Sequence, residues 1–278
     1  MKYLQKFLLT LLFISTLNSC NQKNGLKSFE DNSESKFNPS QQDSLIEIYL
    51  KNGAWKNNPY SQEWQEEINK GLKVDSTVAY LWQQKAMPLF KQSKYELGMP
   101  FIDQAVKYNP KKWQDYRAFI KCIFSKEYEE AIKDFKNYQE KYGYGFVMDH
   151  SYNFYIALSY LQLNKFEKAE KLFEKDYKKT VQENGKGWLH HLDLFYYGIS
   201  KYEQKKYKEA LELFDQALEI YPQFSDVQYY KARTLYKLGR PEEGENVYIK
   251  AKENAKQGYS INEDNAIYER YPYQVRWP

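Results

Sequence analysis

Aromatic, small and bulky apolar residues recur along the chain at helical spacing. Four segments share the order aromatic, small, bulky at positions i, i+3 and i+7; they are Tyr95-Gly98-Ile102, Tyr128-Ala131-Phe135, Phe166-Ala169-Phe173 and Tyr207-Ala210-Phe214. A fifth segment keeps Gly244 and Tyr248 but has Pro241 in the first place. These spacings put the three side chains on one face of an α-helix, where the small residue lets another helix approach closely. The pattern therefore predicts one amphipathic helix per segment.

The helices recur with a nearly constant period, and each is preceded by a second helical segment. The small residues lie 33, 38, 41 and 34 positions apart, which indicates a unit of about 34 residues with short insertions. The clearest unit resembles the tetratricopeptide repeat, which it matches at Leu194, Gly198, Tyr202, Ala210, Phe214, Ala217 and Pro222. Pro222 ends the second helix of that unit.

This resemblance implies an all-α fold, a right-handed α-solenoid of about five helix pairs plus a partial N-terminal repeat. The expected units span residues 79–111, 112–149, 150–190, 191–224 and 225–258. A partial unit covers residues 43–78, with its second helix over 61–74, so the expected solenoid domain is 43–258. The register is least defined at 112–149, and Pro88 falls inside a predicted first helix. Stacked pairs of this kind share one core and leave a concave groove.

The N-terminus has the pattern of an export signal. Two lysines precede an apolar stretch that is too short to span a membrane, and Cys20 follows it. The ending resembles a bacterial lipobox, which implies a signal peptide over 1–19 and lipid attachment at Cys20. A plain secretory peptide with a chance cysteine is the alternative. Residues 20–42 have few aliphatic side chains, so we expect a flexible tether there.

The concave groove is the expected binding surface, because in tetratricopeptide proteins the first helix of each unit lines it. That resemblance assigns to the groove Phe154, Tyr155, Phe195, Tyr196, Tyr229, Tyr230 and Arg233. Aromatic rings there suit an apolar or aromatic segment of a partner, whereas Arg233 needs solvent or an acidic group of a ligand. The alternative is that the rings simply pack between helices.

The last segment, residues 259–278, is rich in aromatic side chains and has no helical period. A solenoid usually ends in a polar capping helix. We therefore expect this tail to fold back along the last repeat or into the groove, with a frayed terminus as the alternative.

Charge and candidate chemistry limit the function further. The chain has 41 Lys and Arg against 37 Asp and Glu, and Lys2 and Lys6 lie in the predicted signal peptide, so a basic face for nucleic acid is not expected. Neighbouring residues on a helix point in different directions, so the pairs Asp149-His150 and His190-His191 are weak metal candidates. Cys122, among apolar neighbours, is expected to be a buried free thiol. No cofactor motif is found.

These observations favour a membrane-anchored, non-catalytic scaffold of the bacterial cell envelope that binds a protein or peptide in its groove. The lipid anchor and the asparagine after Cys20 favour the outer membrane, facing the periplasm. A component of outer-membrane protein assembly is a narrower version of this hypothesis, based on similarity to lipoproteins of that machinery. A glycan-binding lipoprotein that stacks sugars on aromatic rings is the main alternative. A helical lyase that uses Tyr, Lys and Glu is a third.

Overall fold

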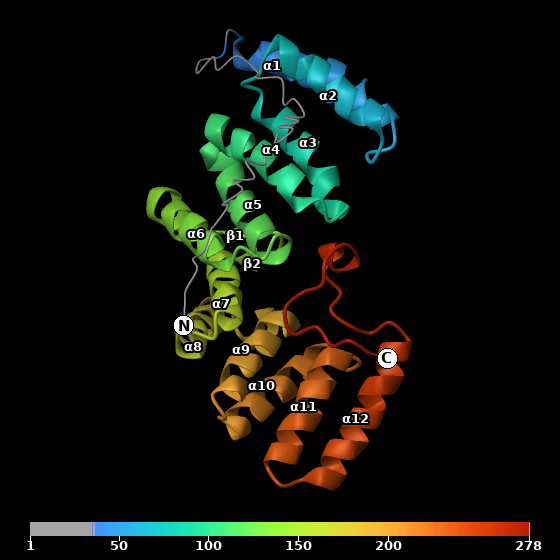
Figure 1. Cartoon of the computed structure of the whole chain (residues 1–278). Coiled ribbons are helices and arrows are strands. Elements are labelled where there is room, and N and C mark those ends of the chain that lie inside the picture. Colours follow the sequence, from blue (N-terminus) through green and yellow to red (C-terminus); the bar gives the residue numbers. More distant parts are fainter. Residues whose placement is uncertain (1–34, 36, 278) are drawn as a thin grey trace, which may run out of the picture. The chain divides into compact units, whose positions relative to one another are not determined.

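A computed structural model describes residue 35 and residues 37–277. The predicted signal peptide, Cys20 and most of the predicted tether therefore lie outside the described residues. The described chain is built almost entirely from α-helices (Figure 1). The α-helices are α1 (Pro39–Ile46), α2 (Gln62–Val74), α3 (Ala79–Lys91), α4 (Tyr95–Tyr108), α5 (Pro110–Ile123), α6 (Tyr128–Tyr142), α7 (Tyr152–Gln162), α8 (Phe166–Asn184), α9 (His191–Glu203), α10 (Tyr207–Ile220), α11 (Ser225–Lys237) and α12 (Pro241–Lys256).

The helices stack in chain order as an α-solenoid. α3 packs on α4, α5 on α6, α7 on α8, α9 on α10 and α11 on α12, and the second helix of each pair also packs on the first helix of the next. This arrangement confirms the all-α solenoid, and its five helix pairs correspond to the five units expected from the sequence. A 3₁₀ turn, η3 (Lys186–Trp188), lies between α8 and α9.

Small residues in the repeats let aromatic rings of the paired helix approach the backbone. A Cβ atom at Gly198 of α9 would lie 2.5 Å from Cε1 of Phe214 in α10. A Cβ atom at Gly98 of α4 would lie 2.6 Å from Cε1 of Phe90 in α3. Both rings are buried in the core. The two glycines therefore set how closely the helices of these pairs pack.

The N-terminal partial unit begins earlier than its predicted start at residue 43. α1 starts at Pro39 and continues into a short π-helix, η1 (Glu47–Lys51). Asn38 forms a capping box, in which its side chain accepts from the Gln41 amide at 3.0 Å while its own amide donates to the Gln41 side chain at 2.9 Å. Because this cap and Pro39 favour a helix start, the ordered chain reaches into the segment expected to be a tether.

α3 continues through Pro88, and the neighbouring helix α2 compensates for the missing hydrogen bond. A proline has no N–H, so the carbonyl of Gln84, four residues earlier, loses its helical partner. The indole Nε1–H of Trp64 in α2 donates to that carbonyl at 3.2 Å. The side chain of Gln65 also donates to the carbonyl of Lys85 at 3.2 Å.

Another 3₁₀ turn, η2 (Ala54–Lys56), lies between η1 and α2.

A two-stranded ribbon precedes α7 and was not expected from the sequence. β1 (Phe146–Val147) pairs antiparallel with β2 (His150–Ser151). The connecting residues Met148 and Asp149 have φ values of 46° and 68°, as the two central positions of a type I′ hairpin turn require. Ser151 then caps α7 by accepting from the Phe154 amide at 2.9 Å. The ribbon thus places His150 at the start of a first helix.

Beyond α12 the chain turns back along the repeats, as one of the two alternatives for the tail expects (Figure 1). It contains one 3₁₀ turn, η4 (Asp264–Ile267). The Tyr95 hydroxyl of α4 bonds Glu269. Lys126, between α5 and α6, donates to the Arg270 carbonyl at 2.8 Å and pairs with Glu269 at 3.4 Å. The tail therefore reaches from the last repeat to the first full one.

Among the described residues, no helix combines the length and the apolar composition that a membrane span requires.

Candidate binding surface and histidine cluster

The seven residues assigned to the groove lie on three successive first helices. Phe154 and Tyr155 are on α7, Phe195 and Tyr196 on α9, and Tyr229, Tyr230 and Arg233 on α11. Five of these side chains are buried, with exposures from 0% for Tyr155, Phe195 and Tyr196 to 9% for Tyr230. Tyr229 is half-buried and Arg233 is exposed. In this conformation, only Tyr229 and Arg233 of the seven offer surface to a partner.

The buried rings form a continuous series of contacts from α5 to α11. Tyr155 packs edge-on against Phe119 with centroids 5.4 Å apart. Phe154 and Tyr196 follow at 5.6 Å, and Phe195 and Tyr230 at 5.7 Å. Edge-to-face and tilted pairs at such distances are favourable beyond the area that they bury. The rings therefore help to hold neighbouring repeats together, as the packing alternative expects.

The tail covers the same rings. The Tyr196 hydroxyl donates to the Pro272 carbonyl at 2.7 Å. Tyr230 contacts Tyr273 with ring centroids 6.0 Å apart, and Tyr229 contacts Trp277 at 5.6 Å. The rings thus pack against helices on one side and the tail on the other, and a binding role for the seven residues stays a prediction.

Asp226, in the first turn of α11, is the main polar anchor of the tail. Its carboxylate accepts from the Val275 amide at 2.6 Å, the Ser260 hydroxyl at 2.7 Å and the Ile261 amide at 3.1 Å. Burial raises the pKa of this carboxyl group, and the three hydrogen bonds oppose that rise. In the sequence, an acidic residue in the first helical turn is typical of ordinary helix capping, so nothing distinguished Asp226.

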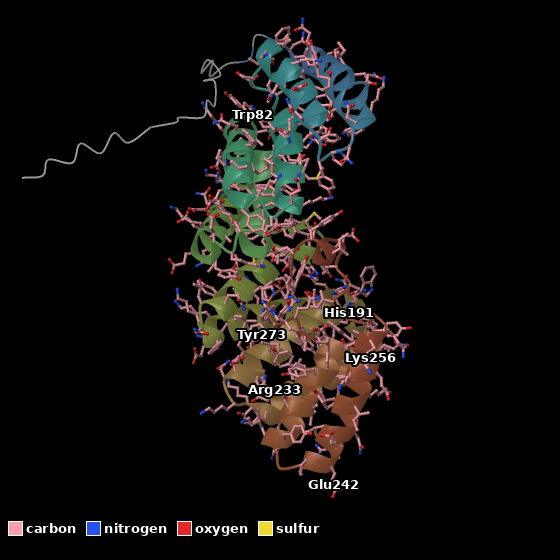
Figure 2. The ribbon with its side chains drawn as sticks, turned by 45° about the vertical axis from the view of Figure 1, so that its right-hand side comes forward. Trp82, His191, Arg233, Glu242, Lys256 and Tyr273 are labelled. Carbon is pink, nitrogen blue, oxygen red and sulfur yellow. The ribbon has the colours of Figure 1, made fainter. Side chains whose placement is uncertain are left out.

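Arg233 of α11, labelled in Figure 2, has its guanidinium group beside three tyrosine rings. Its Cζ lies 5.7 Å from the ring centroids of Tyr202 and Tyr229 and 6.0 Å from that of Tyr230. Rings at this distance stabilise a cation through their quadrupoles. Within the described chain no carboxylate lies within ion-pair distance of Arg233. The group can therefore pair with an acidic group of a ligand.

Three histidines meet at the junction of the third and fourth repeats, a contact between repeats that the spacing within each histidine pair does not predict. His150 is 1% exposed, and its ring stacks on Phe154 with centroids 4.0 Å apart. Its Nδ1 lies 2.8 Å from Asp193 Oδ1 and its Nε2 lies 3.3 Å from Glu263 Oε1 in the tail. Burial opposes a charge on His150, but the two carboxylates outweigh burial and raise its pKa to about 9.

His190 and His191 are the other two members of the cluster: the His190 ring lies 5.0 Å from that of His150 and 4.2 Å from that of His191, between centroids. His190 is the N-cap of α9, and its Nδ1 accepts from the Leu192 amide at 3.3 Å. Desolvation, aided by the neighbouring histidines, lowers the pKa of His190 to about 4. His191 Nε2 instead lies 3.0 Å from Asn262 Oδ1. One signal in the sequence could have found the cluster, because His150 and His190 both precede a first helix and consecutive first helices are neighbours in the stack.

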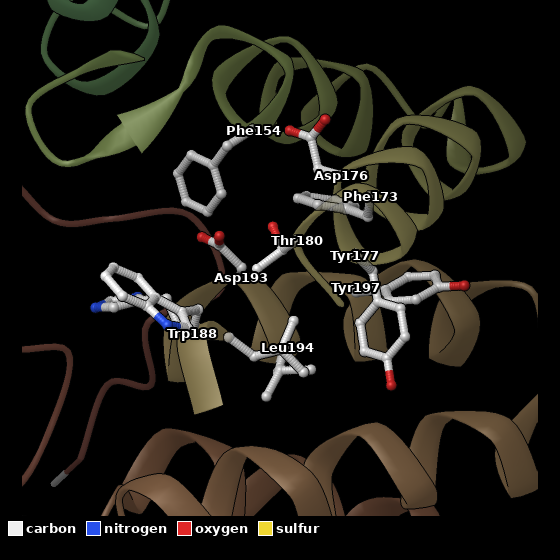
Figure 3. Close-up of a pocket in the computed structure, with 11 residues that line it drawn as sticks. Phe154, Phe173, Asp176, Tyr177, Thr180, Trp188, Asp193, Leu194 and Tyr197 are labelled. Atoms are coloured by element: carbon white, nitrogen blue, oxygen red, sulfur yellow. The ribbon is translucent and has the colours of Figure 1, made fainter. Parts of the chain in front are cut away.

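A small cavity opens beside the histidine cluster, between α7, α8 and α9 (Figure 3). Its volume is about 30 Å³, which is room for a water-sized group. It is lined by Phe154, Phe173, Asp176, Tyr177, Thr180, Trp188, Leu189, His190, Asp193, Leu194 and Tyr197. The lining thus combines aromatic rings with the ionisable side chains of His190, Asp176 and Asp193.

Cys122 is a buried free thiol, as expected. Burial raises its pKa to about 12. The Ser159 hydroxyl donates to its sulfur at 3.3 Å. Such a thiol is uncharged at neutral pH, so it lacks the thiolate that redox or nucleophilic chemistry needs.

The architecture defines a class, the all-α solenoids built from stacked helix pairs. Within this chain, residues 201–260 match the family model of the tetratricopeptide repeat. That match covers α10 to α12, where the signature residues are clearest in the sequence. No curated protein matches the chain.

Solved structures of tetratricopeptide proteins share the fold at low sequence identity. PilW, a type IV pilus biogenesis factor, has a TM-score of 0.59 and 12% identity over 83% of this chain and 100% of its own. A tetratricopeptide repeat protein from Parabacteroides merdae has a TM-score of 0.57 and 14% identity over 79% of this chain and 88% of its own. YrrB, a tetratricopeptide protein with an unusual peptide-binding site, has a TM-score of 0.50 and 16% identity over 69% and 94%.

Proposed function

We propose that this chain is a lipid-anchored, non-catalytic scaffold of the bacterial cell envelope, and that it binds a protein or peptide with an acidic group at Arg233. The solenoid fold supports a binding role, since stacked repeats offer an extended surface. YrrB, which shares the fold, has a peptide-binding site, and PilW acts in pilus biogenesis. The chemistry of the surface around Arg233, beside the tail, indicates which chemical group of a partner would bind there.

The observation that carries the proposal is the exposed Arg233 guanidinium among tyrosine rings. Arginine presents a planar set of donors that matches a carboxylate, and it is more weakly hydrated than lysine, so it pairs well at interfaces. Tyr229 and the exposed Tyr236 of the same helix add contact area and hydroxyl groups. An acidic segment with an apolar or aromatic neighbour fits this surface. A sugar would use the rings but would leave the guanidinium without an anionic partner.

The anchor is proposed from the sequence. Lipid chains on Cys20 would hold the protein on a membrane, because two or more acyl chains bind far more firmly than one. The residues that follow Cys20 would place the solenoid at a distance from the bilayer. We propose the periplasmic face of the outer membrane as its location.

Site-specific photo-crosslinking in intact cells tests the partner proposal. A photo-reactive amino acid replaces Tyr236, one helical turn from Arg233, and the captured adduct is followed on gels. We expect Arg233→Ala to reduce capture about tenfold or more, because a hydrogen-bonded charge pair contributes about 1.5–3 kcal/mol. Arg240→Ala is the matched control. Arg240 is also exposed, but it already pairs with Glu243 in the first turn of α12. Equal capture by the Arg233 and Arg240 variants would remove Arg233 from the binding surface.

The anchor is tested separately by fractionating cells that express the Cys20→Ala variant. We expect the variant to leave the membrane fraction while keeping its helical fold. If it stays with the membrane, the lipid attachment is wrong, whatever the outcome of the crosslinking.

A further inference from the structure

The histidine cluster brings three metal-ligand groups together from two repeats. His150 comes from β2, while His190 and Asp193 come from the start of α9. One ligand atom from each of these residues lies within 4.8 Å of the others. Ligands of a tetrahedral zinc ion, each about 2.0–2.2 Å from the metal, are roughly 3.3–3.6 Å apart. The His150 Nδ1 to Asp193 Oδ1 distance of 2.8 Å is that of a hydrogen bond, so these two atoms would separate slightly around an ion.

The surroundings of His150 resemble a prepared ligand. Stacking on Phe154 and the edge contact with Tyr155, at 6.0 Å between centroids, fix the plane of the imidazole ring. Its second nitrogen faces Glu263 at 3.3 Å. Metal-binding histidines commonly donate their other ring N–H to a carboxylate in this way, which orients the ring and makes it more basic. Glu263 thus supplies the outer contact that such a ligand needs.

The other two groups are accessible. The Asp193 side chain is 44% exposed, and His190 is exposed. The Nδ1 atom of His190 accepts one long hydrogen bond from the Leu192 amide, at 3.3 Å. In the view of Figure 3 the Asp193 carboxylate lies between the rings of Phe154 and Trp188, at the edge of the small cavity. A fourth ligand, such as water, can therefore enter from solvent.

We propose that His150, His190 and Asp193 bind one Zn²⁺ ion per chain, with water as the fourth ligand and Glu263 orienting His150. The ion takes the place of the proton on Nδ1 of His150, which is released to solvent. Two imidazoles and one carboxylate are a ligand set that suits zinc, whereas calcium and magnesium prefer oxygen ligands alone. The ion joins the third repeat to the fourth and, through Glu263, to the tail. This inference does not depend on the partner-binding function.

Binding of Zn²⁺ to the purified full chain tests the site. We expect isothermal titration calorimetry at neutral pH to give one ion per chain, and Co²⁺ in the same site to show the visible absorption of a tetrahedral ion. The variant His190→Ala should bind Zn²⁺ at least tenfold more weakly, because it removes an exposed ligand and leaves the core intact. Glu263→Gln should weaken binding by about 10- to 100-fold, since it alters only the outer contact.

Asp149→Asn provides the control. Asp149 is exposed and next to His150, but it lies outside the ligand set, and asparagine tolerates its positive φ of 68°. Its affinity for Zn²⁺ should equal that of the unaltered protein, which separates ligation from general attraction by carboxylates. Circular dichroism verifies that each variant is folded. No stoichiometric binding by the unaltered protein, or equal affinity in the His190→Ala and Asp149→Asn variants, overturns the proposal.

Discussion

At the scale of single residues, the lack of a side chain at Gly198 determines how one helix pair closes. The ring of Phe214 fills the space that a Cβ atom at Gly198 would occupy, and its Cε1 would lie 2.5 Å from that Cβ. We expect Gly198→Ala to lower the free energy of unfolding by about 1–2 kcal/mol, because overpacking outweighs the helix propensity that alanine adds. Urea unfolding followed by circular dichroism measures the change.

Gly187→Ala is the matched control for this prediction. Apart from its two neighbours in the chain, no residue comes within 4 Å of where a Cβ atom at Gly187 would lie. The change should alter stability by less than about 0.5 kcal/mol. A similar loss in both variants would show that close packing at Gly198 is not the cause.

The residues of the candidate site show which features can be predicted from the sequence and which cannot. The burial of Cys122 was predictable, because its neighbours in the helix are apolar. The meeting of His150, His190 and Asp193 was not predicted, since spacing along one helix says nothing about contacts between repeats. Five groove rings proved to be buried because the tail and neighbouring helices cover them, and these contacts come from distant parts of the chain.

At the scale of helices, Lys201 of α9 links α8 and α10. Its Nζ pairs with Glu170 of α8 at 2.7 Å and also with Glu209 of α10. Glu170 in addition pairs with Lys206, in the turn after α9, at 2.6 Å. These hydrogen bonds lower the pKa of Glu170, although burial opposes them. The carboxylate therefore stabilises the junction only while it is ionised.

The pH dependence of stability tests this junction. Because the pKa of Glu170 is lower in the folded chain than its ordinary value of 4.5, its contribution is present above that pH and is lost as pH falls through the folded-state pKa. We expect Glu170→Gln to cost about 1–3 kcal/mol at pH 7 and progressively less below about pH 4.5. Urea unfolding of both proteins across this range measures the difference. A constant difference would contradict the prediction.

The helices themselves were largely predictable, and their exceptions have local causes. Small residues at a regular period predict the helix pairs, because in each unit a small side chain lets the paired helix approach closely. α3 continues through Pro88, where Trp64 from another helix bonds the carbonyl of Gln84 that the proline leaves without a helical partner, a contact that no helix pattern contains. The β1–β2 ribbon depends on positive φ angles at Met148 and Asp149, which few non-glycine residues adopt.

At the scale of the whole described chain, the tail adds contacts that a simple repeat protein lacks. In a solenoid each repeat touches only its neighbours, so repeats can unfold nearly independently. Here Glu269 and Arg270 contact the first two full units, while Val275 is bonded to Asp226 in the last. The tail therefore couples repeats that are distant in sequence.

Tyr271 tests this coupling, because its ring is 2% exposed. We expect Tyr271→Ala to lower the free energy of unfolding by about 3–5 kcal/mol, as for other large buried rings, and to increase binding of a hydrophobic dye. Ile267→Ala is the control, since that side chain is 79% exposed and should contribute little. Unchanged stability and dye binding in the Tyr271 variant would mean that the tail is not held in place.

The position of this covering segment at the carboxyl end also constrains the order of biogenesis. A chain synthesised from its amino end completes every described repeat before residues 259–278 become available. Until then, Tyr196 and its neighbouring rings lack their final cover and remain available to chaperones or to each other. The repeats thus reach their final packing only once residues 259–277 cover these rings, and a chain that lacks this segment leaves the rings exposed.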